Sequence, residues 1–138
     1  MATTDDVTLV RNAIHNPAEP RHFMRIVPSA TRRQALVDEV TIADSADALV
    51  LKEVGRDIYD PVIYFPPEDV DSGALTPTDV VTRCPLKGEA VAFDITGDPV
   101  IERGAWSYQK TLDFDRRLAQ LECCVAFDGA AVTLEISG

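Results

Sequence analysis

Reactive side chains gather in one stretch of the chain, Thr82-Arg83-Cys84-Pro85-Leu86-Lys87-Gly88-Glu89-Ala90. The run Ala105-Trp106-Ser107-Tyr108 follows it and carries the only tryptophan. Neighbouring cations favour the thiolate form of a cysteine, so an exposed Cys84 beside Arg83 and Lys87 is a candidate nucleophile or redox thiol. Lys87 is also a candidate catalytic amine or a fixed cation for an anionic ligand.

Each of these residues also has a purely structural interpretation. A free cysteine is most often buried as a small hydrophobic side chain, and a lysine beside Gly88 is commonly an exposed turn residue. Trp106 and Tyr108 alternate with Ser107, so both rings share one face of a strand and form either core or the wall of a cleft. The predicted ligand-binding residues are Arg83, Tyr64, Trp106 and Tyr108.

The remaining acids and histidines give weaker signals. Glu68 and Asp69 are adjacent and point to different sides, so they are expected to stabilise the start of a helical turn or to pair with Arg83. His15 and His22 lie on either side of a proline break. A catalytic pair of histidines needs a third, orienting group, and the sequence names none.

Composition narrows the classes of partner. The 138 residues suffice for one domain, and 13 basic against 23 acidic residues give a net charge of −10. Such a field repels phosphate backbones and anionic membranes, so neither nucleic acid nor membrane is expected as a partner. A local basic cluster at residues 21–25 and 32–33 is either a solvated rim or an anion site.

The cysteines and the lengths of the apolar runs indicate the cellular compartment of the protein. Three cysteines, two of them adjacent, make a poor disulfide framework and favour a reducing environment. No apolar run reaches the length of a membrane span, and the first residues are acidic where a signal peptide is basic. We therefore predict a cytoplasmic protein.

The first residues predict a short helix. Thr4 is a suitable cap, and Val7, Val10 and Ile14 fall on one helical face before Pro17 ends the pattern. One narrow apolar stripe needs a surface to cover it. Residues 1–30 are thus expected to form an extension that packs on the domain or on a partner subunit, and residues 31–138 a single β domain.

The rest of the chain has the period of strands. Two turns predict hairpins, Asp38-Glu39 and the stronger Asp128-Gly129. A short helix is expected over residues 113–121, and one helical turn after Pro66. Because crossover helices are missing, the fold class is mainly β and antiparallel. Strands are expected at residues 23–27, 34–37, 40–43, 49–53, 62–65, 80–83, 90–95, 100–108, 123–127 and 131–136.

Four ordered blocks resemble a known family. They are Pro61-Val62-Ile63-Tyr64-Phe65-Pro66-Pro67-Glu68-Asp69-Val70 with Leu75-Thr76-Pro77-Thr78-Asp79, Cys84-Pro85-Leu86-Lys87-Gly88-Glu89-Ala90, Ala105-Trp106-Ser107-Tyr108, and Val125-Ala126-Phe127. In order and spacing they are similar to domain of unknown function family 427, small bacterial and fungal proteins, over residues 33–138. The resemblance implies a β-tent-like fold, in which two antiparallel sheets meet at an angle, as in methionine sulfoxide reductase B and the ligand-binding domain of cereblon.

The resemblance also bears on metals and on one proposed activity. Many β-tent proteins hold zinc through two Cys-x-x-Cys knuckles, but here Lys87 stands where the second cysteine would be, so no structural zinc or other cofactor is predicted. Members also carry a nucleotidyltransferase label. Such enzymes need a Gly-Ser turn before a pair of metal-binding carboxylates, and no Gly-Ser precedes Asp113-Phe114-Asp115. Nucleotidyl transfer is therefore not expected.

Three functions are left open by the sequence. The first is a β domain that binds a small anionic or planar ligand in a polar pocket near Cys84, Lys87 and Trp106. The second is an enzyme that uses Cys84 as an activated thiol. The third is a structural or interaction protein that forms a homodimer through the N-terminal helix and the strand at residues 23–27.

Overall fold

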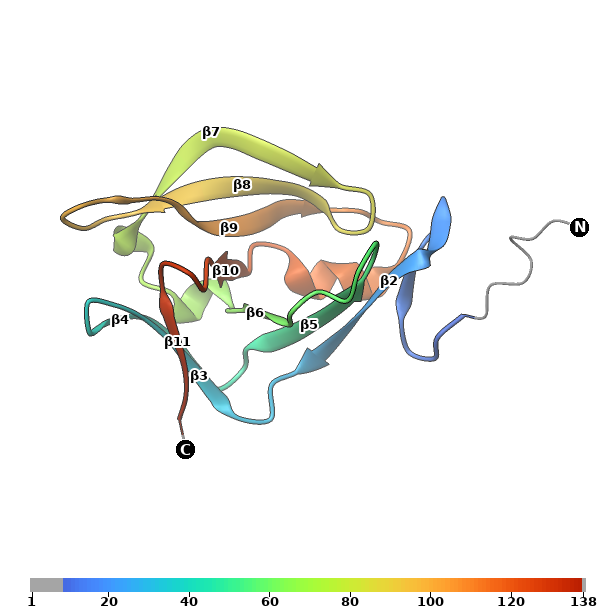
Figure 1. The fold of residues 1–138 in the computed structure, drawn as a ribbon, viewed down its shortest axis with the longest axis horizontal. Coiled ribbons are helices and arrows are strands. Elements are labelled where there is room, and N and C mark those ends of the chain that lie inside the picture. Colours follow the sequence, from blue (N-terminus) through green and yellow to red (C-terminus); the bar gives the residue numbers. More distant parts are fainter. Residues whose placement is uncertain (1–8, 138) are drawn as a thin grey trace, which may run out of the picture.

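The computed structural model describes residues 9–137, and short antiparallel strands in three sheets make up most of this range (Figure 1). Within residues 9–137 there is no α-helix, and the helical turns are short 3-10 segments. The prediction of a mainly β, antiparallel fold is confirmed. None of the helical turns in this part of the chain is long and apolar enough to cross a membrane.

The strands are distributed over the three sheets in an order that differs from the order along the chain. Sheet 1 has the order β1-β2-β5-β6, sheet 2 the order β10-β9-β8-β7, and sheet 3 the order β11-β3-β4. The elements are β1 Ile14–Asn16, β2 Glu19–Pro28, β3 Arg32–Val37, β4 Val40–Ser45, β5 Leu49–Val54, β6 Val62–Tyr64, η2 Pro67–Asp69, η3 Ser72–Ala74, β7 Leu75–Cys84, β8 Gly88–Ile95, β9 Ile101–Thr111, η4 Arg116–Leu121, β10 Val125–Phe127 and β11 Thr133–Ser137.

One of the two predicted hairpins forms. Val37 and Val40 are paired, and Asp38 and Glu39 between them both have positive φ, as a type I′ turn requires. The Asp128-Gly129 prediction is wrong. The strands on either side of that turn join different sheets, because β10 pairs with β9 while β11 pairs with β3.

The N-terminal helix is not observed in the described residues. Residues 1–8 lie outside them, and the part that follows contains β1, in which Ile14 pairs with Met24. Ile14 is buried, but through a strand edge rather than a helical face. The spacing of apolar residues that predicts the helix is therefore overridden by pairing with β2.

The helix expected over residues 113–121 is not observed in that form. Only η4, a 3-10 helix capped by Asp115, lies there, and its Leu118 and Leu121 are fully buried. The apolar positions point inward as expected, yet the segment is too short for an α-helix. The single turn predicted after Pro66 is present as η2.

Two hydrophobic clusters lie on opposite faces of sheet 2. Tyr108 and Ala126 face the first cluster, which includes Leu51 and Tyr64 of sheet 1. Ala105 and Phe127 belong to the second cluster, together with residues of sheet 3. The alternation of side chains along β9 and β10 thus makes sheet 2 a common wall of both cores.

Candidate functional site

A cleft of about 540 Å³ opens between sheets 1 and 2. Its walls are mostly apolar and aromatic, and charged side chains lie at its inner end and at its rim. The lining residues are Leu51, Glu53, Tyr59, Val62, Tyr64, Val80, Thr82, Lys87, Ala92, Arg103, Ala105, Trp106 and Tyr108. A concave, mainly apolar site with a few polar groups is the usual form of a small-molecule site.

Sheet 1 supplies the carboxylate of this cleft. Along β5, Leu49, Leu51 and Glu53 share one face, because alternate residues of a strand point the same way. Leu51 pairs with Val62 of β6, and Leu49 with Tyr64. The carboxylate of Glu53 therefore continues an apolar stripe into the interior, where a charge needs partners.

Sheet 2 supplies the aromatic wall. Ala92 lies opposite Trp106 in the register of β8 and β9, and Ala90 lies opposite Tyr108. A small residue beside each large ring leaves open space over the sheet. Trp106 is half-buried, whereas Tyr108 is buried.

Lys87 reaches the cleft from the turn between β7 and β8. The carbonyl of Lys87 accepts the N–H of Leu112, and its own N–H bonds the carbonyl of Cys84. Gly88 next to it has a φ of 135°, and a Cβ there would collide with the carbonyl of Lys110. The close approach of this turn to β9 directs the lysine inward.

The Lys87 ammonium is buried and paired. Its residue is 6% exposed, its Nζ lies 2.6 Å from Oε1 of Glu53, and it lies 5.7 Å from the centre of the Tyr108 ring. An ammonium needs such compensation away from water, and a ring face adds a weak attraction for the cation.

His22 engages the other oxygen of Glu53. His22 Nε2 is 2.6 Å from Oε2, and Nδ1 is 3.3 Å from Nδ2 of Asn16. The orientation of the Asn16 amide is set because its Oδ1 accepts the N–H of Ala18. Asn16 therefore donates to Nδ1, and His22 donates through Nε2–H to the carboxylate. We call these residues, Lys87–Glu53–His22–Asn16, the Glu53 network.

Burial and ion pairing determine which side chains of the cleft are charged. Burial by itself raises the pKa of Glu53, but the attraction and hydrogen bond of Lys87, with the hydrogen bond of His22, hold that pKa below its usual value. Burial raises the pKa of Tyr64 and Tyr108 far above the ordinary phenol value. Both phenols thus stay protonated at neutral pH.

The Tyr64 hydroxyl is free to donate a hydrogen bond. Trp106 Nε1–H donates to the Tyr64 oxygen at 3.1 Å. Because that oxygen accepts a bond, the Tyr64 O–H is left to donate to another acceptor. This donor lies in the cleft beside the half-buried indole.

A family model described as a domain of unknown function (DUF427) matches residues 25–138. The chain belongs to this family. No curated protein matches the sequence.

The DUF427 region contains all the residues that line the cleft but only half of the Glu53 network. Glu53 and Lys87 lie inside residues 25–138, whereas Asn16 and His22 precede them. In this DUF427 protein the strands β1 and β2 therefore bring additional polar groups to the family's β domain.

The structure brings four of the predicted site residues together and separates two. Lys87, Tyr64, Trp106 and Tyr108 all line the cleft. Arg83 does not: its side chain is 82% exposed and pairs with Glu89 at 3.1 Å. The alternation of β7 explains this, because Arg83 occupies the face opposite to Thr82.

Cys84 lies at the edge of the site. It is half-buried against the first core and borders a separate cavity with Pro85 and Lys110. Its side chain nevertheless packs against the buried cluster that contains Tyr108. Cys84 is therefore a neighbour of the cleft wall and not part of the lining.

Glu68 and Asp69 lie in the first turn of η2, which is one of the two roles expected of them, whereas Arg83 pairs with Glu89 and not with either acid. Asp69 instead accepts the hydroxyl of Ser45 at 2.6 Å. Arg83 is satisfied by the residue opposite to it on β8.

Sequence reasoning missed Glu53 and the role of His22. A signal for Glu53 was available in Leu49-Val50-Leu51-Lys52-Glu53, where the acid takes the place of the next apolar residue on the buried face. No local signal indicates His22, because its partner lies 31 residues away. In the described part of the chain no three His, Cys, Asp or Glu side chains cluster as a metal site requires.

Proposed function

We propose that this DUF427 protein binds a small planar organic anion in the cleft between sheets 1 and 2. The observation that carries the proposal is the buried Lys87–Glu53 pair at the end of a cleft walled by Trp106. Buried charges are costly for stability, and a fixed ion pair that borders open space suits recognition of a polar ligand better than it suits a core.

The walls favour a flat ligand. The half-buried Trp106 lies opposite Ala92 on sheet 2, its indole N–H donates to Tyr64, and Val62 of sheet 1 lines the same cleft. Aromatic surfaces of this kind stack with planar rings and bury much area without ordering flexible chains. A ring of one or two cycles fits a cleft of about 540 Å³.

The polar groups favour an anion. The Tyr64 O–H is a donor, and an ammonium has three N–H bonds of which Lys87 gives one to Glu53. Arg103 adds a cation at the rim. Lys87 and Arg103 against Glu53 leave the lining one positive charge in excess, although the whole chain carries −10.

The test is a ligand-observed NMR screen of aromatic carboxylates, each paired with the neutral amide of the same ring. We expect carboxylates such as benzoate and indole-3-carboxylate to bind better than their amides. Tyr64→Phe, which removes only the hydroxyl, should weaken carboxylate binding about fivefold, the effect of one net hydrogen bond. Arg103→Gln should reduce the preference for carboxylate over amide.

Arg83→Gln is the matched control, because Arg83 is on the same sheet and points away from the cleft. It should leave binding unchanged. If no ring binds saturably, or if Arg83→Gln weakens binding as much as Tyr64→Phe, the cleft is not the binding site.

The two alternative functions have less support. An enzyme with Cys84 as activated thiol needs that thiol in an open site with the substrate, whereas Cys84 is half-buried and outside the cleft lining. A homodimer through residues 23–27 needs a free strand edge, and at Phe23 and Met24 both edges of β2 are already paired, one with β1 and one with β5. Native-state alkylation of Cys84 and the solution mass of the full chain test these alternatives.

The facing sheets around the cleft support the β-tent-like architecture that the sequence predicts. The free state of all three cysteines supports a reducing, cytoplasmic environment.

A further inference from the structure

A second cavity lies at the opposite end of the Glu53 network, beyond His22. It has a volume of about 470 Å³ and is lined by Asn16, Glu19, Arg21, His22, Gly55, Arg56 and Tyr59. Only Tyr59 belongs to the lining of both this cavity and the cleft. The cavity is therefore a separate space, and the proposed function does not use it.

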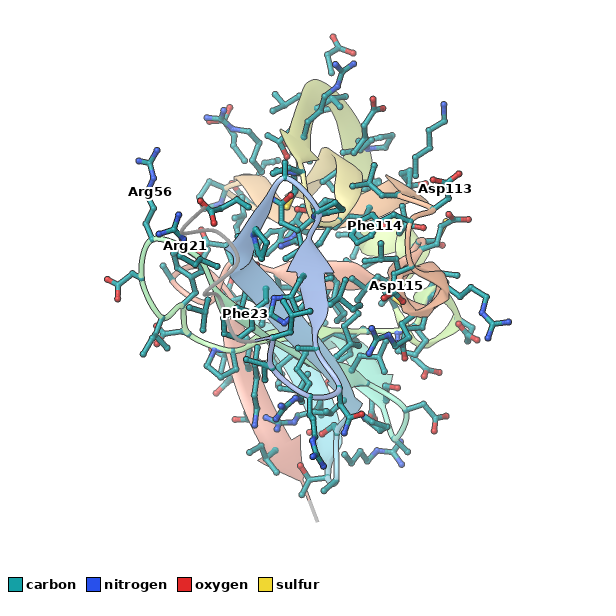
Figure 2. All side chains as sticks on the ribbon, turned by 90° about the vertical axis from the view of Figure 1, so that its right-hand side faces the viewer. Arg21, Phe23, Arg56, Asp113, Phe114 and Asp115 are labelled. Carbon is teal, nitrogen blue, oxygen red and sulfur yellow. The ribbon has the colours of Figure 1, made fainter. Side chains whose placement is uncertain are left out.

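Two arginines line this cavity. Arg21 comes from β2 and Arg56 from the turn after β5, and Figure 2 shows both on the same side of the molecule. Arg56 forms no ion pair within the described residues. Two cations held together in a chain of charge −10 favour an anionic partner.

Glu19 competes for one of these arginines. It accepts from Arg21 at 3.0 Å and 3.3 Å, but the two side chains are 48% and 70% exposed. Ion pairs so exposed contribute little to stability, so an anion of higher charge can displace Glu19 at small cost. With Arg21 and Arg56 counted against Glu19, the lining of the cavity still carries one excess positive charge.

The floor of the cavity adds a fixed neutral donor. Asn16 is 5% exposed, and its amide is held by the N–H of Ala18 on one side and by His22 on the other. A primary amide has two N–H bonds, and only one of them reaches His22. The second N–H belongs to a side chain that lines the same cavity as the two arginines.

The turn that carries Arg56 is rigid. Gly55 N–H bonds the carbonyl of Asp57, and Tyr59 N–H bonds the carbonyl of Glu53. A Cβ at Gly55 would come within 3.0 Å of the Tyr59 ring, so the turn packs tightly against that ring. Arg56 is thus presented from a fixed backbone, which lowers the entropic cost of binding.

We propose that this cavity binds a phosphate group, either free or as the monoester of a small metabolite. Guanidinium groups pair with phosphate through two parallel hydrogen bonds, and a tetrahedral anion has enough oxygens to accept from Arg21, Arg56 and Asn16 together. A planar carboxylate has only two oxygens for these three donors. Phosphate also carries more negative charge than the Glu19 that it displaces.

The experiment is an NMR titration of the full chain with sodium phosphate, at constant pH and with sodium chloride added to hold the ionic strength. The signals to follow are the side-chain amide of Asn16 and the backbone amide of Gly55. We expect saturable shifts of both, and a second titration with phosphoserine tells whether the ester binds as well. Binding of either form supports the site.

Charge-matched variants give opposite expected results. Arg56→Gln should weaken phosphate binding about tenfold, and Glu19→Gln should strengthen it about threefold because the competing carboxylate is gone. Arg116→Gln and Glu102→Gln make the same charge changes at exposed positions outside the cavity. Both controls should leave the affinity within twofold of the native chain.

Two results would overturn the proposal. One is the absence of saturable shifts with either probe at constant ionic strength. The other is an equal loss of affinity in Arg56→Gln and Arg116→Gln, because binding would then follow the net charge and not the cavity. Neither result depends on the cleft, so failure here is distinct from failure of the proposed function.

Discussion

At the scale of single residues, the central group is the Glu53 carboxylate. It accepts from Lys87 through one oxygen and from His22 through the other, and its side chain is 16% exposed. The partners do not merely neutralise it. They set its position, and with it the position of the Lys87 ammonium at the end of the cleft.

Replacing Glu53 by Gln should destabilise the protein strongly at neutral pH. The substitution leaves the Lys87 ammonium buried without a counter-charge, a change that costs roughly 3–5 kcal/mol. The measurement is the free energy of unfolding in urea. Glu89→Gln is the control, since Glu89 forms an exposed pair with Arg83 and should cost at most about 1 kcal/mol.

The same variant should show a distinct pH dependence. Because the pKa of Glu53 in the folded protein lies below its ordinary value of 4.5, its contribution to stability is fully present above that value. It is lost as the pH falls below 4.5 and through the folded pKa. The gap in stability between the native chain and Glu53→Gln should therefore shrink as the pH falls from above 4.5 through the lowered pKa of Glu53. A gap that stays constant over this range would contradict the assignment.

At the scale of elements, the turn between β7 and β8 positions Lys87 in the cleft. Its conformation depends on Gly88, whose φ of 135° is rarely adopted by other residues. The glycine also lies against the backbone of β9, so no flexible side chain can move aside to make room.

Gly88→Ala should lower stability by at least about 2 kcal/mol, because the new methyl group meets the Lys110 carbonyl and the backbone is strained. Gly129→Ala is the matched control. Its Cβ would meet only the end of Leu134 at 3.9 Å, so its effect should be close to zero. Thermal unfolding followed by circular dichroism compares the two, and similar melting temperatures would show that the turn tolerates a side chain.

The elements also show what the sequence can predict. Strand positions and the Asp38-Glu39 hairpin follow from local alternation and turn chemistry, and both are observed. The partner of a strand is not local. The Asp128-Gly129 dipeptide is a favoured hairpin turn, yet β11 pairs with β3 and not with β10. Val132, just before β11, is buried in the second core, and this anchors the start of the strand away from β10.

The residues of the site likewise divide into those that local sequence predicts and those that only the packing of the sheets reveals. Trp106 and Tyr108 can be placed on one face from their spacing, and Lys87 from its position at a strand end. The Glu53 partner of Lys87 is 34 residues away in the sequence, so only the packing of sheet 1 on sheet 2 reveals the pair. Arg83 and Cys84 have the right chemistry, but the pleat of β7 and the core remove them from the cleft.

At the scale of the whole molecule, sheet 2 couples the two cores. Phe65 shows how the coupling is made. It is fully buried in the second core, stacks edge-on with Phe127, and exchanges two backbone hydrogen bonds of 2.8 Å with Val125 of β10. The preceding residue, Tyr64, belongs to the first core and lines the cleft.

Because one chain segment joins both cores, we expect a single cooperative unfolding transition. Phe65→Ala should cost roughly 3–5 kcal/mol through lost burial and the cavity that it leaves. Trp106 fluorescence reports the first core and far-ultraviolet circular dichroism the whole β structure. In urea, both signals should shift to lower denaturant together, although the mutation lies in the other core. A Trp106 transition that stays at its original midpoint would mean that the cleft and its half of the molecule fold independently of the second core.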